Sequence, residues 1–110
     1  LRQKENKMAK QDSHSNSHSN KAYDYLLALL AQTNDKAHLS EILKALLTEK
    51  EQAELGNRLT IFALLQQEVT QREISAQLGV GIATVSRGAK VFHQHQIDEL
   101  LPDIGDKINI

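Results

Sequence analysis

From residue 22 onward, apolar residues recur every three or four positions, which is the spacing of amphipathic helices. Two such groups predict helices over roughly 21–32 and 38–46. The turn formers Thr33, Asn34 and Asp35 separate them. The apolar positions of the two helices are Tyr23, Leu26, Leu27 and Leu30, and then Leu39, Ile42, Leu43 and Leu46.

Two capping boxes mark the starts of the next helices, Thr48 with Glu51 and Thr70 with Glu73. The helix after Thr48 should run to about Gln67 and be the most buried one, because its apolar stripe is wide. That stripe consists of Ala53, Leu55, Leu59, Ile61, Phe62, Leu64 and Leu65.

The helix after Thr70 is short and should end at Gly79, a residue that readily adopts the left-handed conformation. Gly81 permits a second tight excursion before a further helix that opens at Ile82. A last helical stretch, 95–101, is stopped by Pro102. The pattern predicts an all-α fold of about six short helices in one domain over 21–102.

The two ends of the chain lack this periodicity. Residues 1–20 are polar and rich in Ser, Asn and Lys, so they cannot bury enough apolar surface to offset the entropy of ordering. We therefore predict a flexible polar arm over 1–20. Residues 103–110 are predicted to form a C-terminal tail.

Composition narrows the class of protein. A chain of 110 residues is too short for a two-domain enzyme, and without cysteine it has no disulfide, thiolate nucleophile or cysteine-based zinc site. There is neither an apolar run long enough to span a membrane nor a signal peptide. These observations favour a cytoplasmic protein without a membrane partner.

The net charge of -1 is unevenly distributed. Residues 57–93 carry a net charge of +2, whereas the flanking segments 23–56 and 94–110 each carry -3. Contact with DNA would therefore need a local basic patch. Its candidate members are Arg58, Arg72, Arg87 and Lys90, which would otherwise be ordinary charges on solvated helix faces.

The segment 70–91 meets the requirements of a helix-turn-helix. Ser75 supplies a small residue at the crossing, Gly79 supplies the turn, and Ile74, Leu78, Val80 and Val85 would hold the helices together. The second helix then presents small, polar or basic residues that can approach a major groove. Those expected to face DNA are Gly81, Ile82, Ala83, Thr84, Ser86 and Lys90, with Thr70, Gln71 and Arg72 at phosphates or a groove edge.

The segments LLTEKEQAELGNR (46–58) and TQREISAQLGVGIATVSRGAK (70–90) together resemble the tryptophan repressor family of bacterial transcription regulators. The resemblance covers about residues 23–92 and is strongest from Leu47 to Gly88. It implies an intertwined homodimer that binds a palindromic double-stranded DNA operator when L-tryptophan, its corepressor, is bound.

The resemblance also implies an effector site. Arg58 and Arg87 would sandwich the indole, with Arg87 also near the carboxylate and Thr48 close by, and Gly88 would leave room for the ring. The carbonyls of Ala45 and Leu47 would hold the ammonium, which suits the negative end of a helix dipole.

Three positions depart from the family pattern. Val91 replaces a hydroxyl residue that helps to hold the ammonium, Thr60 stands where arginine is common, and the connection 66–68 is one residue shorter than usual.

Other classes of function find less support. No catalytic motif is present, so we expect neither an enzyme nor a catalytic cofactor. The pairs His14 with His18 and His93 with His95 are better explained as solvated side chains than as metal ligands. Two alternatives stay open: a regulator of the same fold with a different effector or none, and a helical protein-interaction module that uses the stripe from Leu26 to Leu46.

Overall fold

The computed structural model describes residues 5–108, with side-chain exposure given for 17–108. This part of the chain contains seven helices and no strand, which confirms the all-α class. The chain divides into two compact units, one ending at Leu46 and the other beginning at Leu47.

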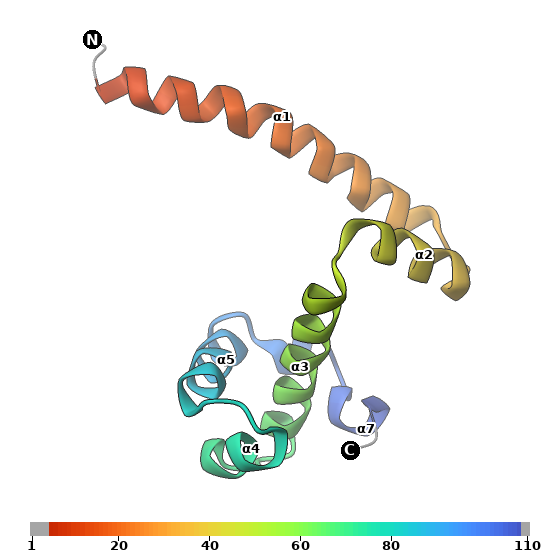
Figure 1. Cartoon of the computed structure of the whole chain (residues 1–110), viewed down its shortest axis with the longest axis vertical. Coiled ribbons are helices and arrows are strands. Elements are labelled where there is room, and N and C mark those ends of the chain that lie inside the picture. The colour runs from red at the N-terminus through yellow and green to blue at the C-terminus, as the bar shows by residue number, and fades with distance from the viewer. Residues whose placement is uncertain (1–4, 109–110) are drawn as a thin grey trace. The chain divides into compact units, whose positions relative to one another are not determined.

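The first unit contains α1 (Glu5–Gln32) and α2 (Lys36–Leu46), joined by a short turn (Figure 1). At this turn, side chains form hydrogen bonds with backbone groups. The Thr33 hydroxyl donates to the Leu29 carbonyl at 2.7 Å, and the Asp35 carboxylate accepts from the Ala37 amide at 3.1 Å. The predicted turn formers are therefore confirmed.

Helix α1 begins at Glu5, so the predicted start of the first helix near residue 21 is wrong. Most of the segment predicted as a polar arm continues this helix, while residues 1–4 lie outside the described part. A polar segment needs no core to be helical, because each residue added to a nucleated helix gains a backbone hydrogen bond. The domain boundary at residue 20 remains a prediction.

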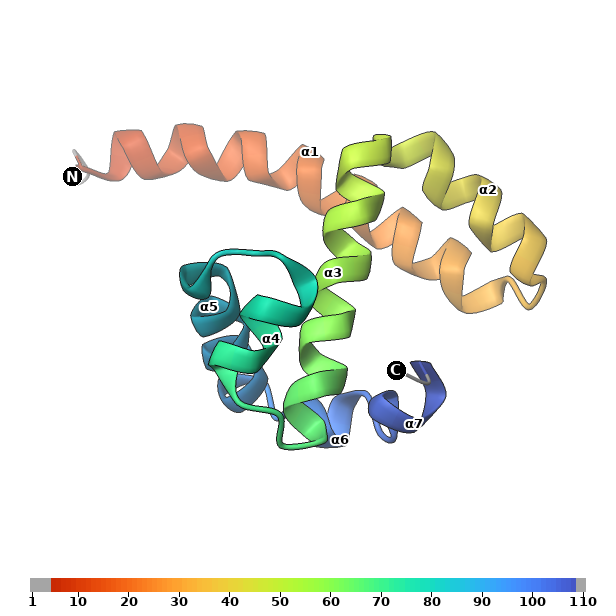
Figure 2. The ribbon, with the colours of Figure 1, turned by 60° about the horizontal axis from the view of Figure 1, so that its bottom comes forward.

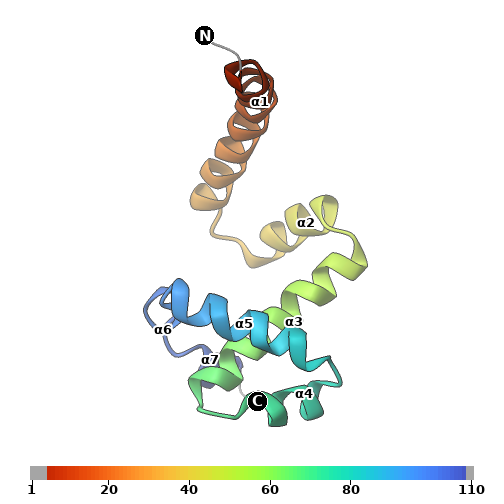
Figure 3. The same cartoon turned by 90° about the vertical axis from the view of Figure 1, so that its left-hand side faces the viewer.

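The second unit is built around α3 (Glu49–Gln66). Figure 2 shows α4 (Gln71–Leu78) and α5 (Ile82–Gln94) on one side of α3 and α7 (Ile104–Ile108) on the other. Figure 3 shows α5 crossing α3. The capping box at Thr48 is present as predicted: its hydroxyl accepts from the Glu51 amide at 3.0 Å, and the Glu51 carboxylate accepts from the Thr48 amide at 2.9 Å.

The core of the second unit consists of two clusters that meet on α3. One contains Ile61, Leu64, Ile74 and Val85 and holds α4 and α5 to α3. The other contains Phe62, Ala63, Phe92, Ile97 and Ile104 and anchors α5, α6 (Ile97–Leu100) and α7. Four consecutive residues of α3, 61–64, are therefore buried from both sides.

Only the second half of α3 forms this core. Ala53 and Leu55, which we predicted within the buried stripe, are exposed in the described unit. The helices of this unit that pack on α3 bury residues 61–64 and none nearer its start. The expectation that α3 is buried along its whole stripe is therefore corrected.

The C-terminal segment contains a helix that the sequence did not predict. The final predicted helix over 95–101 is shorter, covering only Ile97–Leu100, and Pro102 follows it as expected. The chain then forms α7, because Ile104 joins the core and the Gly105 amide donates to the Gln66 side chain at 2.9 Å. The expected tail over 103–110 is thus helical over 104–108, and residues 109–110 lie outside the described part.

Candidate functional site

The connection between α4 and α5 is a tight turn held by one side chain. Gly79 closes α4 in the left-handed conformation, with φ 68°, as predicted. The Ser75 hydroxyl donates to the Val80 carbonyl across the turn at 2.6 Å. Gly81 has φ -66°, which any residue adopts, so the second excursion that we predicted there is absent.

Apolar contacts lock α4 against α5. Ile74 and Val85 are completely buried, and Leu78 and Val80 pack against them while partly exposed. These are the four residues predicted to hold the pair together. Burial of two β-branched side chains on facing helices leaves little freedom to change the crossing of α4 and α5.

The residues predicted to face DNA are exposed. This holds for all six on α5 and its cap, Gly81, Ile82, Ala83, Thr84, Ser86 and Lys90, and for Thr70, Gln71 and Arg72 at the start of α4. Thr70 also caps α4: its hydroxyl accepts from the Glu73 amide at 3.2 Å and donates to the Glu73 carboxylate at 3.1 Å.

One hydrogen bond joins the two exposed groups of residues. The Ser86 hydroxyl on α5 donates to the Gln71 side-chain oxygen on α4 at 2.9 Å. This leaves the Gln71 amide nitrogen as a donor for another molecule. The bond therefore orients a polar group at the edge of the exposed surface.

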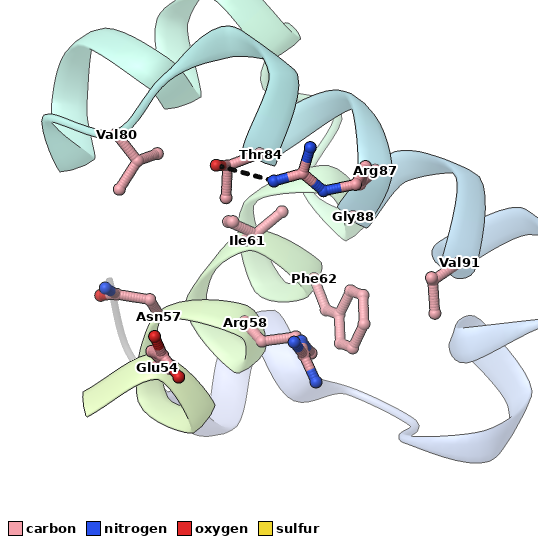
Figure 4. A pocket seen from close by; sticks show the side chains of 10 residues that line it. All are labelled: Glu54, Asn57, Arg58, Ile61, Phe62, Val80, Thr84, Arg87, Gly88 and Val91. Carbon is pink, nitrogen blue, oxygen red and sulfur yellow. Dashed lines mark hydrogen bonds between the residues drawn. The ribbon is translucent and has the colours of Figure 1, made fainter. Parts of the chain in front are cut away.

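A pocket of about 560 Å³ lies between α3 and α5, within the usual range for small-molecule sites (Figure 4). Arg58 enters it from α3 and Arg87 from α5, so two guanidiniums come from facing walls. The lining residues are Glu54, Asn57, Arg58, Ile61, Phe62, Val80, Thr84, Arg87, Gly88 and Val91.

The pocket contains four of the seven residues predicted for the effector: Arg58, Arg87, Gly88 and Val91. Leu47 and Thr48 do not line it. The Leu47 carbonyl accepts from the Gln52 side chain at 3.2 Å, and the Thr48 hydroxyl caps α3. Ala45 belongs to the first unit.

Thr84 connects the pocket to the exposed face of α5. It lines the pocket, and its hydroxyl accepts from the Arg87 guanidinium at 3.4 Å. A ligand that draws the Arg87 guanidinium away from Thr84 would break this long hydrogen bond. Thr84 was predicted to contact DNA and not the effector.

Gly88 serves helix packing. A β-carbon there would lie 2.9 Å from Ile61 Cγ2, closer than nonbonded carbon atoms approach. The missing side chain therefore allows α5 to approach α3, whereas the resemblance implied that it leaves space for a ring.

Sequence analysis missed five lining residues, namely Glu54, Asn57, Ile61, Phe62 and Val80. Glu54 and Phe62 stand four positions before and after Arg58, and Ile61 stands three after it, so helical spacing places them on the same face. That signal was available. Val80 lines the pocket because of the path of the turn between α4 and α5, and helical periodicity does not predict that path.

Two other kinds of site are absent from the described part of the chain. Among residues 17–108, whose side chains are described, no group of three or more histidine, cysteine, aspartate or glutamate side chains could hold a metal ion. No helix within 5–108 combines the length and apolar character needed to cross a bilayer.

Comparison with known proteins gives a consistent family match. The model of the family described as Trp repressor protein matches residues 21–100. A Trp operon repressor homolog of Aliivibrio fischeri (strain MJ11) is 36% identical over 78 residues, covering 70% of this chain and 72% of the relative.

Two other bacteria have similar proteins of the same description. The Xylella fastidiosa (strain M23) homolog is 32% identical over 81 residues, covering 73% of this chain and 88% of the relative. The Vibrio cholerae serotype O1 homolog is 37% identical over 78 residues, covering 70% of this chain and 76% of the relative. No solved structure gives a significant match.

Proposed function

The chain belongs to the Trp repressor family, and on that premise we propose that it is a DNA-binding repressor with L-tryptophan as its corepressor. One observation carries the proposal: the pocket with two facing arginines lies directly behind a helix whose outward residues include the small, polar and basic side chains of Ala83, Ser86 and Lys90. The protein would have no catalytic role.

The DNA-binding part of the proposal rests on α4 and α5, which we take as a helix-turn-helix. Helix α5 would enter the major groove, and its exposed side chains are short enough to allow close approach. The start of α4 would contact the phosphate backbone of the DNA. The free backbone amides of its first turn and the Arg72 side chain both favour a phosphate group.

The effector part rests on the chemistry of the pocket. An indole fits between guanidiniums and apolar side chains, since cations are attracted to aromatic faces. The carboxylate of an amino acid would pair with an arginine. Ile61, Phe62 and Val91 supply the apolar surface that the ring needs.

Linkage explains how tryptophan would control DNA binding. A ligand shifts an equilibrium only if it binds one arrangement better than another. Because the pocket walls are α3 and α5, a ligand wedged between them would hold α5 at one angle. The orientation of the DNA-contacting face would then depend on tryptophan.

We further propose a homodimer, supported by the exposed apolar side chains of the first unit. None of its residues from 17 to 46 is buried, and Tyr23, Tyr25, Leu27 and Leu46 are all strongly exposed. Apolar surface of this kind calls for a partner. In a twofold-symmetric dimer, the α5 helix of each copy would contact one half of a palindromic operator.

The DNA-binding role is tested by measuring affinity for a duplex at several salt concentrations. Arg72→Ala and Lys90→Ala should each lower the affinity and reduce the log–log salt slope by about one for each phosphate that the variant no longer binds. Lys107→Ala is the matched control, because Lys107 is exposed on α7, outside the proposed face. Equal behaviour of all three variants would contradict the assignment of the face.

A further inference from the structure

One acidic side chain stands among the residues of the effector pocket. Glu54 lines it from α3, one helical turn before Arg58. Figure 4 shows Glu54 beside Asn57 at the end of the pocket away from Val91. The pocket therefore contains both signs of charge, with a carboxylate at one end and guanidiniums in the middle.

This carboxylate has no partner within the described residues. Glutamate four positions before arginine commonly forms an ion pair on a helix. The structure records no such pair between Glu54 and Arg58, and in Figure 4 the Arg58 side chain extends away from Glu54. The Glu54 carboxylate is therefore available to pair with a positively charged group of a ligand.

The acceptors that line the pocket are not the carbonyls that the family resemblance implies for an ammonium group. The Leu47 carbonyl is outside the lining and already accepts from Gln52. Val91, which does line the pocket, offers only methyl groups. Among the lining side chains, Glu54 is the only anion and so the strongest acceptor for a cationic group.

We propose that Glu54 accepts the ammonium group of the effector and makes the pocket select amino acids over carboxylic acids that lack the amine. The inference rests on the proposed function, since it assigns a determinant of ligand choice within the same pocket. A ligand with a carboxylate and no ammonium satisfies the arginines but leaves its own negative charge near that of Glu54.

Calorimetry with two ligands tests this assignment. L-tryptophan and indole-3-propionate share the ring and the carboxylate, and only the first has an ammonium. Glu54→Gln removes the charge while keeping nearly the same shape. A charge-assisted hydrogen bond at an exposed site predicts that this change weakens L-tryptophan binding roughly three- to tenfold. Binding of indole-3-propionate should stay the same or become tighter.

Glu49→Gln is the matched control, because Glu49 is exposed in the first turn of the same helix and does not line the pocket. It should leave both affinities unchanged. An unchanged ratio of the two affinities in Glu54→Gln would overturn the inference, and so would tighter tryptophan binding, which would mean that Glu54 competes for an arginine.

The same titrations separate this inference from the proposed function. If wild-type protein binds L-tryptophan and the ratio does not respond to Glu54→Gln, only the role of Glu54 is wrong. If wild-type protein binds neither ligand at millimolar concentration, the proposed effector role is wrong, and the role of Glu54 with it.

Discussion

At the scale of single residues, the pocket depends on close contact between a glycine and an isoleucine. Ile61 is buried to 2% exposure, and its Cγ2 atom lies 2.9 Å from the place that a β-carbon of residue 88 would take. A buried side chain surrounded by others cannot move aside freely. A side chain at position 88 would therefore force Ile61 or the backbone of α5 to shift.

Gly88→Ala should destabilise the protein by about 1–3 kcal/mol, since overpacking forces side chains or backbone to shift. Gly56→Ala is the control, because a β-carbon at Gly56 meets nothing within 4 Å. It should stabilise α3 by about 0.5–1 kcal/mol, as alanine replaces glycine within a helix. Urea unfolding measures both, and equal effects would show that residue 88 does not touch Ile61.

The sequence predicted residue roles well where chemistry is local and less well where it depends on packing. Thr48 and Thr70 were identified as caps from their spacing to Glu51 and Glu73, and both boxes are present. Helical spacing places Glu54 on the same face as Arg58, but the opposite wall of the pocket depends on how α5 packs against α3, which the sequence does not describe.

At the scale of elements, α4 and α5 act as one rigid piece because two side chains between them are fully buried. Ile74→Ala should cost about 2–5 kcal/mol, from lost burial and the cavity that remains. Ile82→Ala should change stability by no more than about 0.5 kcal/mol, since exposed positions seldom matter more. Ile82 is 52% exposed.

The same two variants separate stability from DNA binding, because each can be measured by an unfolding curve and by a binding titration. We expect Ile82→Ala to lower DNA affinity while it leaves the unfolding midpoint nearly unchanged. A large loss of stability in Ile82→Ala would place that side chain in the core and contradict the exposed face.

The hydrogen bond between Ser86 and Gln71 links α4 and α5 on the side that we propose to face DNA. Ser86→Ala should weaken DNA binding by freeing the Gln71 side chain, although Ser86 need not touch DNA itself. In a double-mutant cycle, Ser86→Ala and Gln71→Ala should be non-additive by at least about 0.5 kcal/mol, because they share one interaction. Strictly additive losses would show that the two residues act independently.

The helix boundaries show which features a sequence can predict. The turn at 33–35 and the end of α4 at Gly79 were predicted because side chains or a glycine define them. The start of α1 was not, since nothing in a polar helix marks a boundary. Helix α7 was missed because it depends on a distant bond, from the Gly105 amide to Gln66.

At the scale of the whole molecule, the proposed function calls for two copies of the chain. The first unit buries none of its residues from 17 to 46, so its apolar side chains need another surface. Sedimentation equilibrium should give twice the chain mass of 12.3 kDa. A monomer at micromolar concentration would contradict the proposed twofold complex.

Substitution in the first unit should change this association. Leu27→Asp, at a position 47% exposed in the single chain, should weaken dimerisation at least about tenfold if it lies at the interface centre. Lys21→Asp, an exposed position earlier in α1, is the control and should have little effect. Equal effects of the two variants on dimerisation would show that Leu27 does not lie in the interface.

The most direct test of the central claim compares DNA affinity with and without the proposed effector. A palindromic duplex recovered by selection from random DNA is titrated at fixed salt, in the absence and presence of millimolar L-tryptophan. We predict that tryptophan tightens binding at least about fivefold, the lower end of typical coupling between two sites. Equal affinity in the two titrations would contradict the proposed role of tryptophan.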